Sequence, residues 1–436
     1  MEPTTQPSQH AVQLPHCRSA ERSAMTPPWH FLNFCPLPQG QGSFRPTCIF
    51  RRSVYSYRVA IYFVVLLAVL NSISQRGSKV AVSLYALELG AGALAVGVLA
   101  ALFATFPLLL AVHAGKISDR IGVRTPMMCG AATMALALAI PALVPGLPAL
   151  FVCPALIGLG HIFFHVSVHN LVGSYGSGAE RTRNFATFSL GSSVAAFIGP
   201  SLAGFGIELA GYRTALATLA GFALLPALVL FLSKGLVAAK AHAEKDERAK
   251  SAFDLLAIPA LRRTLILSGV ALTGIELFSF YLPIYGRSIG LAPSAIGMIL
   301  SSYAVAGFIV RVVMHRLARR FTEVGVLTGS LFVAALAYAA LPALSHGLLL
   351  AVAAFSLGLA LGSAQPLTII LTYNHAPKGR SGEALGMRIM ANKVTQIGVP
   401  LAFGGLGAAL GAAPVFLATG AFLLAAGLLS LQSPKD

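Results

Sequence analysis

The chain has 436 residues, of which 56% are hydrophobic and only 10% are charged. A soluble domain carries about 25% charged residues, so this composition excludes a soluble globular protein. The formal net charge of +17 would favour nucleic acid in a polar protein, but the basic residues here fall mostly in short gaps between apolar runs. The sequence therefore predicts an integral membrane protein with the lipid bilayer as its surroundings and no nucleic-acid partner.

The amino-terminal segment, residues 1–54, differs from the rest of the chain. It is rich in Pro and polar residues, and the first apolar run begins near Val59, too late for a secretory signal peptide. We expect a disordered cytoplasmic tail, within which Met25 is a second candidate start.

Long apolar runs follow this tail. A helix needs about 20 apolar residues to cross a bilayer, and the chain contains twelve runs of that order. They cover residues 57–87, 92–113, 125–144, 148–172, 184–208, 212–233, 262–286, 292–316, 323–343, 346–373, 383–409 and 413–432. A polar linker at 235–261 separates six spans from six. This pattern predicts an all-α membrane protein with six-helix bundles at 55–234 and 262–436.

The basic residues outside the spans set the predicted orientation. Nearly all of them lie in the tail, in the linker and in every second loop, and only Arg213 and Arg287 lie on the opposite side. Cytoplasmic loops carry an excess of Lys and Arg, so both termini are predicted to be cytoplasmic, in a bacterial inner membrane.

The two halves repeat with a constant offset of 200 residues. The matched pairs are Tyr85 and Tyr285, Gly90 and Gly290, Gly97 and Gly297, Arg120 and Arg320, Gly158 and Gly358, Pro200 and Pro400, Gly204 and Gly404, and Gly211 and Gly411. Parallel repeats related by an axis along the membrane normal are a known transporter plan, with the substrate site between them near the midplane.

A charged loop joins the second and third spans. Its sequence, GKISDRIGVR at residues 115–124, resembles the GxxxDRxGR signature of the major facilitator superfamily. The resemblance implies twelve helices in two pseudo-symmetric bundles, and a secondary transporter in which this loop latches the halves. It assigns gating roles to Gly115, Asp119, Arg120, Gly122 and Arg124. The alternative is a basic loop that only sets topology.

The fifth span contains a second family-like segment. Gly199, Pro200 and Gly204 match the GPxxGG motif of the superfamily's proton-coupled exporters, the drug:H+ antiporter branch, whereas Ala195 and Ala203 depart from it. The resemblance implies export and a gating role for Gly199 and Pro200. The alternative is ordinary packing of small residues.

Six charged residues lie inside predicted spans. An ionised group at the centre of a membrane helix costs roughly 2.5–3.5 kcal/mol, so each must face water, pair or reach the interface. We expect Arg311 to reach the cytoplasmic interface and Lys393 to pack between helices. The six residues are Arg76, Lys79, Glu276, Arg311, Arg388 and Lys393.

Arg76 and Glu276 share the 200-residue offset and so lie at equivalent depths in the first and seventh spans. In the superfamily these helices line the central cavity. We expect both residues to face the substrate pathway and to form an ion pair that a proton on Glu276 weakens, which couples protons to transport. The alternative is a static structural pair.

Further polar residues occupy the tenth and eleventh spans. Arg388, Asn392 and Gln396 recur every four residues and form one stripe, and Gln365 precedes a helix-breaking Pro. We expect all four to bind substrate together with Arg76. Because cations dominate this set, an anionic substrate is expected, with Arg76 and Arg388 as its clamps.

The fourth span carries His161, His165 and His169 at a spacing of four. Histidine titrates near neutral pH, so His161 and His165 are candidates for proton coupling. A path for transition-metal ions is the alternative, although no thiolate or carboxylate accompanies them in this span.

The resulting hypothesis is a proton-coupled exporter of a small anionic or amphipathic compound. Proton-coupled uptake of an organic anion is the main alternative, followed by a non-transporting membrane sensor and a metal-ion exporter. The sequence has no P-loop and no HExxH or GxSxG motif, so neither ATP hydrolysis nor an enzyme is expected. We expect no cofactor, no bound metal and a monomer.

Overall fold

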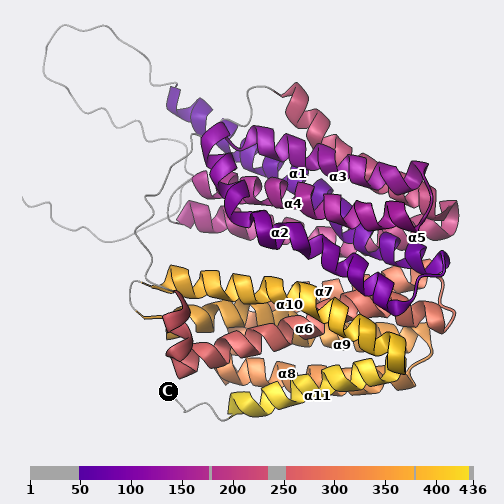
Figure 1. Ribbon diagram of the computed structural model, residues 1–436. Coiled ribbons are helices and arrows are strands. Elements are labelled where there is room, and N and C mark those ends of the chain that lie inside the picture. Colours follow the sequence, from indigo (N-terminus) through magenta and orange to yellow (C-terminus); the bar gives the residue numbers. More distant parts are fainter. Residues whose placement is uncertain (1–48, 176–178, 234–251, 378–379, 432–436) are drawn as a thin grey trace, which may run out of the picture. The chain divides into compact units, whose positions relative to one another are not determined.

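The computed structural model describes residues 49–175, 179–233, 252–377 and 380–431, and these residues contain α-helices and two short 3-10 helices but no strands (Figure 1). The first half of the chain holds α1 Ile49–Glu88, α2 Ala93–Ile121, α3 Arg124–Leu143, α4 Leu147–Ser174 and α5 Ala179–Leu232. The second half holds α6 Pro259–Ser288, α7 Pro293–Phe321, α8 Glu323–Ala340, α9 Gly347–His375, α10 Ser381–Leu410 and α11 Ala412–Leu431. The 3-10 helices are Ala252–Ala257 and Leu341–Ala343.

Helix boundaries differ from the predicted ones at two places. α1 already begins at Ile49, inside the segment predicted as a tail, and the rest of that tail lies outside the described residues. The described end of the predicted linker contains a 3-10 helix and the start of α6 at Pro259. Proline suits a first helical turn because its missing N–H has no partner there.

α5 consists of two helices separated by a break at Gly211. Gly211 breaks it with φ 80° and ψ 169°, a conformation that Gly adopts without a Cβ clash, and so separates the fifth and sixth predicted spans. In the described ranges, ten helices are long and apolar enough to cross a membrane, counting α5 once. α10 is not among them because its first half is polar, with Arg388, Asn392, Lys393 and Gln396.

The repeat is visible in the backbone. Gly90 after α1 and Gly290 after α6 have φ 83° and 78°, and both turns use the same hydrogen bonds, from the Gly N–H to the carbonyl three residues earlier. Gly211 and Gly411 likewise have φ 80° and 82°. Positive φ at the residue after a helix is the common glycine C-cap, so equivalent positions end equivalent helices in the same way.

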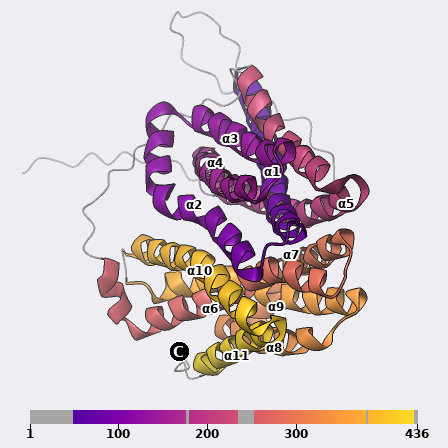
Figure 2. The same cartoon turned by 45° about the vertical axis from the view of Figure 1, so that its right-hand side comes forward.

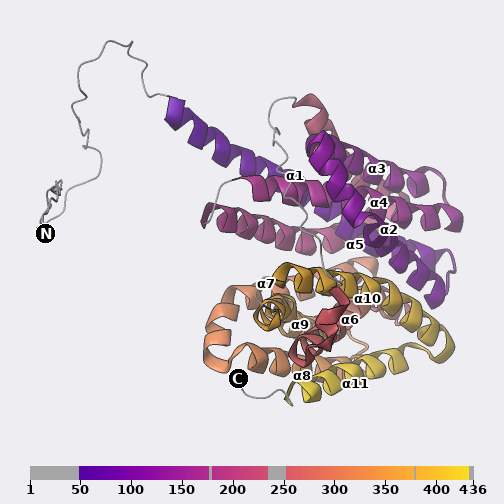
Figure 3. The ribbon, with the colours of Figure 1, turned by 60° about the vertical axis from the view of Figure 1, so that its left-hand side comes forward.

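The two halves contact each other along two seams, α2 against α10 and α5 against α7 (Figures 2 and 3). A Cβ on Gly97 would lie 2.4 Å from the carbonyl oxygen of Pro400, and one on Gly297 would lie 2.5 Å from that of Pro200. Small residues let backbones approach this closely. Both seams lie toward the end at which α2 and α7 begin, which we call the closed end.

Polar contacts also join the halves at the closed end. Glu88, the last residue of α1, forms an ion pair with Arg287 near the end of α6 and accepts a hydrogen bond from the Tyr212 hydroxyl at 3.5 Å. The Ser201 and Ser301 hydroxyls lie 2.7 Å apart. The small-residue seams and these contacts hold the halves together on one side of the membrane.

Replacing Gly97 by Ala should destabilise the protein by about 1–3 kcal/mol, because the new methyl group would overlap the Pro400 carbonyl. We expect a melting temperature a few degrees lower in thermal unfolding of the purified protein. Gly398→Ala is the matched control, since nothing lies within 4 Å of a Cβ there. Equal melting temperatures for the two variants would show that the seam is not tightly packed.

A charged cavity between the two halves as the candidate functional site

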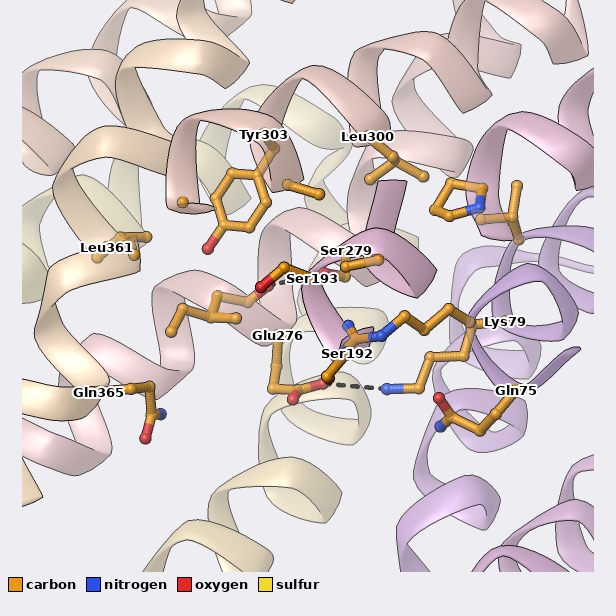
Figure 4. A pocket seen from close by; sticks show the side chains of 18 of the residues that line it. Gln75, Lys79, Ser192, Ser193, Glu276, Ser279, Leu300, Tyr303, Leu361 and Gln365 are labelled. Atoms are coloured by element: carbon orange, nitrogen blue, oxygen red, sulfur yellow. Dashed lines mark hydrogen bonds and ion pairs between the residues drawn. The ribbon is translucent and has the colours of Figure 1, made fainter. Parts of the chain in front are cut away.

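A cavity of about 260 Å³ lies between the two halves and is lined by residues of α1, α5, α6, α7 and α9 (Figure 4). Its wall combines apolar positions with polar side chains from both halves. The polar side chains are Gln75, Arg76, Lys79, Ser192, Ser193, Glu276, Ser279, Tyr303, Arg311 and Gln365. Charged groups at this depth therefore face a cavity and not lipid.

An ion pair crosses the cavity from one half to the other. The Lys79 Nζ on α1 lies 3.6 Å from the Glu276 Oε2 on α6, with the two side chains 37% and 17% exposed. The sequence predicted Arg76 as the partner of Glu276. Instead, the Arg76 Nη2 donates to the Ser192 Oγ at 3.4 Å, and the lysine one turn further along α1 takes the carboxylate.

Arg311 on α7 also lines the cavity. Its Nε donates to the Gly362 carbonyl of α9 at 3.2 Å, whereas the sequence predicted a side chain that reaches the cytoplasmic interface. The described side chains on the cavity wall thus include three cations, Arg76, Lys79 and Arg311, and one carboxylate, Glu276.

Arg388 does not line this cavity, which corrects its predicted place as a substrate clamp. It is buried, with only 4% of its surface exposed, and its Nη2 donates to the Gln365 Oε1 at 2.6 Å and to the Thr368 Oγ1 at 2.9 Å. Of the α9 and α10 residues predicted to bind substrate, only Gln365 lies on the cavity wall.

The remaining residues of the predicted α10 stripe have partners within the second half. The Asn392 Oδ1 accepts from the Ser268 Oγ at 3.3 Å, and the Lys393 Nζ donates to the Gln396 Oε1 at 3.0 Å. Neither Asn392 nor Gln396 lines the cavity, so this structure does not bring the stripe to the expected site.

The three histidines of α4 form a ladder beside the cavity and not on its wall. The Nε2 atoms of His165 and His169 lie 3.2 Å apart, and the His161 ring centroid is 5.1 Å from that of His165. The His161 Nδ1 is buried without a hydrogen-bond partner among the described residues. In the same residues, no group of three His, Cys, Asp or Glu side chains could hold a metal ion.

The segment predicted as a charged loop, residues 115–124, instead forms the end of α2 through Ile121 and the first residue of α3, and it contacts its own half. Arg124, the first residue of α3, donates to the Leu230 carbonyl at 2.7 Å and to the Phe231 carbonyl at 3.1 Å, at the end of α5. Gly122 supplies a turn with φ 83°, and Arg120 is exposed. Gly115 has no neighbour that would exclude a side chain, and the Asp119 side chain lies outside the described part of the structure.

Gly199 and Pro200 lie at the cavity and at a seam between the halves. A Cβ on Gly199 would lie 3.0 Å from the Arg76 Cβ, and the Pro200 carbonyl contacts Gly297 of α7. Pro200 also lines the cavity. The segment therefore sets how closely α5 packs on α1 and α7.

Sequence reasoning missed several cavity residues, among them Gln75, Ser192, Ser193, Ser279 and Tyr303. A helical-spacing signal existed for two of them. Gln75 precedes Lys79 by four residues and Ser279 follows Glu276 by three, so each shares a helix face with a charged residue. The other three have no charged neighbour at such a spacing.

Sequence comparison decides the family. The profile of the Major Facilitator Superfamily matches residues 64–392 and 264–435. The chain belongs to the major facilitator superfamily. No curated protein sequence matches it significantly. Membership confirms the predicted all-α membrane fold of this family and indicates a multi-pass membrane transporter, not an enzyme.

Solved structures share this fold at low sequence identity. A peptide transporter POT in complex with sulfate is 17% identical, with a TM-score of 0.69 over 85% of this chain and 93% of that one. A mutant of the nucleoside transporter NupG is 13% identical, with a TM-score of 0.72 over 85% of this chain and 99% of that one. A bacterial homolog of the human lysosomal transporter Spinster is 17% identical, with a TM-score of 0.69, covering 86% of this chain and 96% of that one.

Replacing Arg124 by Gln should destabilise the protein by about 1.5–3 kcal/mol, because carbonyls at the end of α5 lose hydrogen bonds from a charged donor. Arg120→Gln, at an exposed position near the end of α2, should leave the melting temperature within one degree. Thermal unfolding compares the two variants. A larger loss for Arg120→Gln than for Arg124→Gln would contradict this assignment.

Proposed function

We propose that this superfamily member is a proton-coupled secondary transporter that exports a small anionic or amphipathic compound by alternating access. The observation that carries the proposal is the Lys79–Glu276 ion pair, which joins the two halves across a cavity whose other charged groups are cations. Protonation of the Glu276 carboxylate removes its charge, so the ion pair and the link between the halves are lost together.

The low dielectric constant of the membrane interior makes this switch effective. Attraction between opposite charges is stronger there than in water, and so is the cost of leaving one of them unpaired. Uptake of a proton by Glu276 frees Lys79, and release of the proton restores the pair. The proton gradient can therefore drive the change in the arrangement of the two halves.

The α4 histidines offer a route by which protons reach this ion pair. The charges of Arg76 and Lys79 act on His161, so this ring lies within electrostatic range of the cavity. The ring contacts of His165 with His161 and His169 extend the ladder along α4. We assign His161 and His165 to proton transfer toward Glu276.

The orientation and direction of transport complete the proposal. With both termini in the cytoplasm of a bacterial cell, the closed end faces outward, and the segment from Gly115 to Arg124, where α2 ends and α3 begins, faces the cytoplasm and gates that side. Export rests on the exporter-like segment at Gly199 and Pro200, which lies at the cavity and the seam. The cationic cavity also favours uptake of an organic anion, which is the second candidate function.

Glu276→Gln should separate exchange from proton coupling. In proteoliposomes screened with organic anions, this neutral variant should still exchange the substrate across the membrane, but a pH gradient should no longer drive its accumulation, with a loss of at least tenfold. Glu323→Gln, at the start of α8, is the control and should behave as the wild type. Accumulation by Glu276→Gln at the wild-type level would refute coupling through this carboxylate.

Membrane vesicles of defined orientation decide the direction of transport. Substrate accumulation in inside-out vesicles with an acidic lumen indicates export in exchange for protons. Accumulation in right-side-out vesicles with an acidic exterior indicates uptake and would replace the export proposal. Absence of flux for every anion tested in both preparations would contradict proton-coupled anion transport.

A further inference from the structure

We propose that one oxyanion group of the substrate, a carboxylate, phosphate or sulfate, binds between Arg76 of α1 and Arg311 of α7, and that this single group holds the two halves together. The inference rests on the proposed function, because it names how that cavity recognises its substrate. It concerns binding alone, and so it can be tested without transport or a proton gradient.

The two guanidinium groups have unused hydrogen-bonding capacity. Each carries five N–H donors, and the structure gives each one contact, from Arg76 to the Ser192 Oγ at 3.4 Å and from Arg311 to the Gly362 carbonyl at 3.2 Å. Both side chains line the same cavity. The planar fork of an arginine fits the two oxygens of a carboxylate or phosphate, so these donors suit an oxyanion.

The charges in the cavity also require an anion. Arg311 lies close enough to Arg76 for the two positive charges to repel each other. Glu276 forms an ion pair with Lys79 and also attracts Arg76, so the three cations and one carboxylate of the described cavity wall keep a formal excess of two positive charges. An oxyanion placed between the two guanidinium groups converts this repulsion into two attractions, each strengthened by the low dielectric constant of the surroundings.

Neutral donors border the same space. The Tyr303 hydroxyl lies within electrostatic range of both arginines, and Gln365 lines the cavity. Because the buried Arg388 donates to the Gln365 Oε1 at 2.6 Å, the amide oxygen is engaged and the NH2 group remains for a ligand. Arg388 thus acts as a positioning residue for a third donor, which explains why it stands beside the cavity and not in it.

The placement of the two arginines links binding to conformation. α1 belongs to the first half and α7 to the second, so an anion gripped by both reduces the repulsion that keeps the halves apart at this depth. Binding then favours the arrangement in which the halves approach each other around the ligand.

The test is thermal unfolding of the full chain in detergent, with sodium sulfate, sodium phosphate or sodium succinate compared with sodium chloride at equal ionic strength. At least one oxyanion should raise the melting temperature of the wild type above the chloride value. Arg76→Gln and Arg311→Gln should each weaken the apparent affinity at least tenfold. Arg316→Gln, at an exposed position of α7 outside the cavity lining, is the matched control and should keep the stabilisation.

The double variant distinguishes one shared anion from two separate sites. With a single bridging group the two losses are coupled, so Arg76→Gln combined with Arg311→Gln should lose less affinity than the sum of the two single losses, whereas independent sites give additive losses. Arg76→Lys and Arg311→Lys replace any glutamine variant that fails to fold. Their losses of apparent affinity should be intermediate, because lysine keeps the positive charge but lacks the planar guanidinium group.

Three results would overturn the proposal. They are a wild type that no oxyanion stabilises beyond chloride, a single variant that keeps full stabilisation, and additive losses in the double variant. These outcomes are independent of proton coupling. If Glu276→Gln still accumulates substrate, the coupling proposal fails while the anion site stands. If no oxyanion stabilises the wild type, the anion site fails while the coupling proposal stands.

Discussion

The arrangement of this protein depends on one constraint, that ionised side chains inside a membrane cannot face lipid at low cost. Arg76, Lys79, Glu276 and Arg311 satisfy it by meeting in one cavity between the halves, where they pair, bond to neutral groups or face open space. The excess of cations that remains is the basis of the proposed anion site. The placement of the charges and the proposed recognition therefore follow from the same electrostatic requirement.

The close packing of the halves has a different origin. Seams of Gly and Pro at Gly97 with Pro400 and at Gly297 with Pro200 bring helix backbones together without large side chains. Van der Waals packing of this kind is the main attraction available between membrane helices, because lipid tails are as apolar as leucine. Such seams, helped by the exposed Glu88–Arg287 pair, hold the closed end together, and in the proposed function this end separates when the charges in the cavity change.

Sequence alone predicted the helices, the break near Gly211 and the repeat, because apolar length and glycine positions determine them. The 200-residue offset also pointed to Arg76 and Glu276, which the structure places at one cavity. The offset could not tell whether Arg76 or Lys79 reaches Glu276, because the two residues lie about one turn apart on the same face of α1. The sequence also could not predict that Arg311 lines the cavity while Arg388 does not. Helix spacing shows which residues share a face, but not which neighbouring helix that face contacts.

Polar residues of both halves should face one water-accessible cavity. Cysteine accessibility tests this in a cysteine-free background, using Ser193→Cys from the first half and Ser279→Cys from the second, with the exposed apolar position Leu136→Cys as the control. A membrane-impermeant maleimide should label both cavity positions from the cytoplasmic face of sealed vesicles and leave the control unlabelled. Protection of both cavity positions from reagent on either face would contradict it.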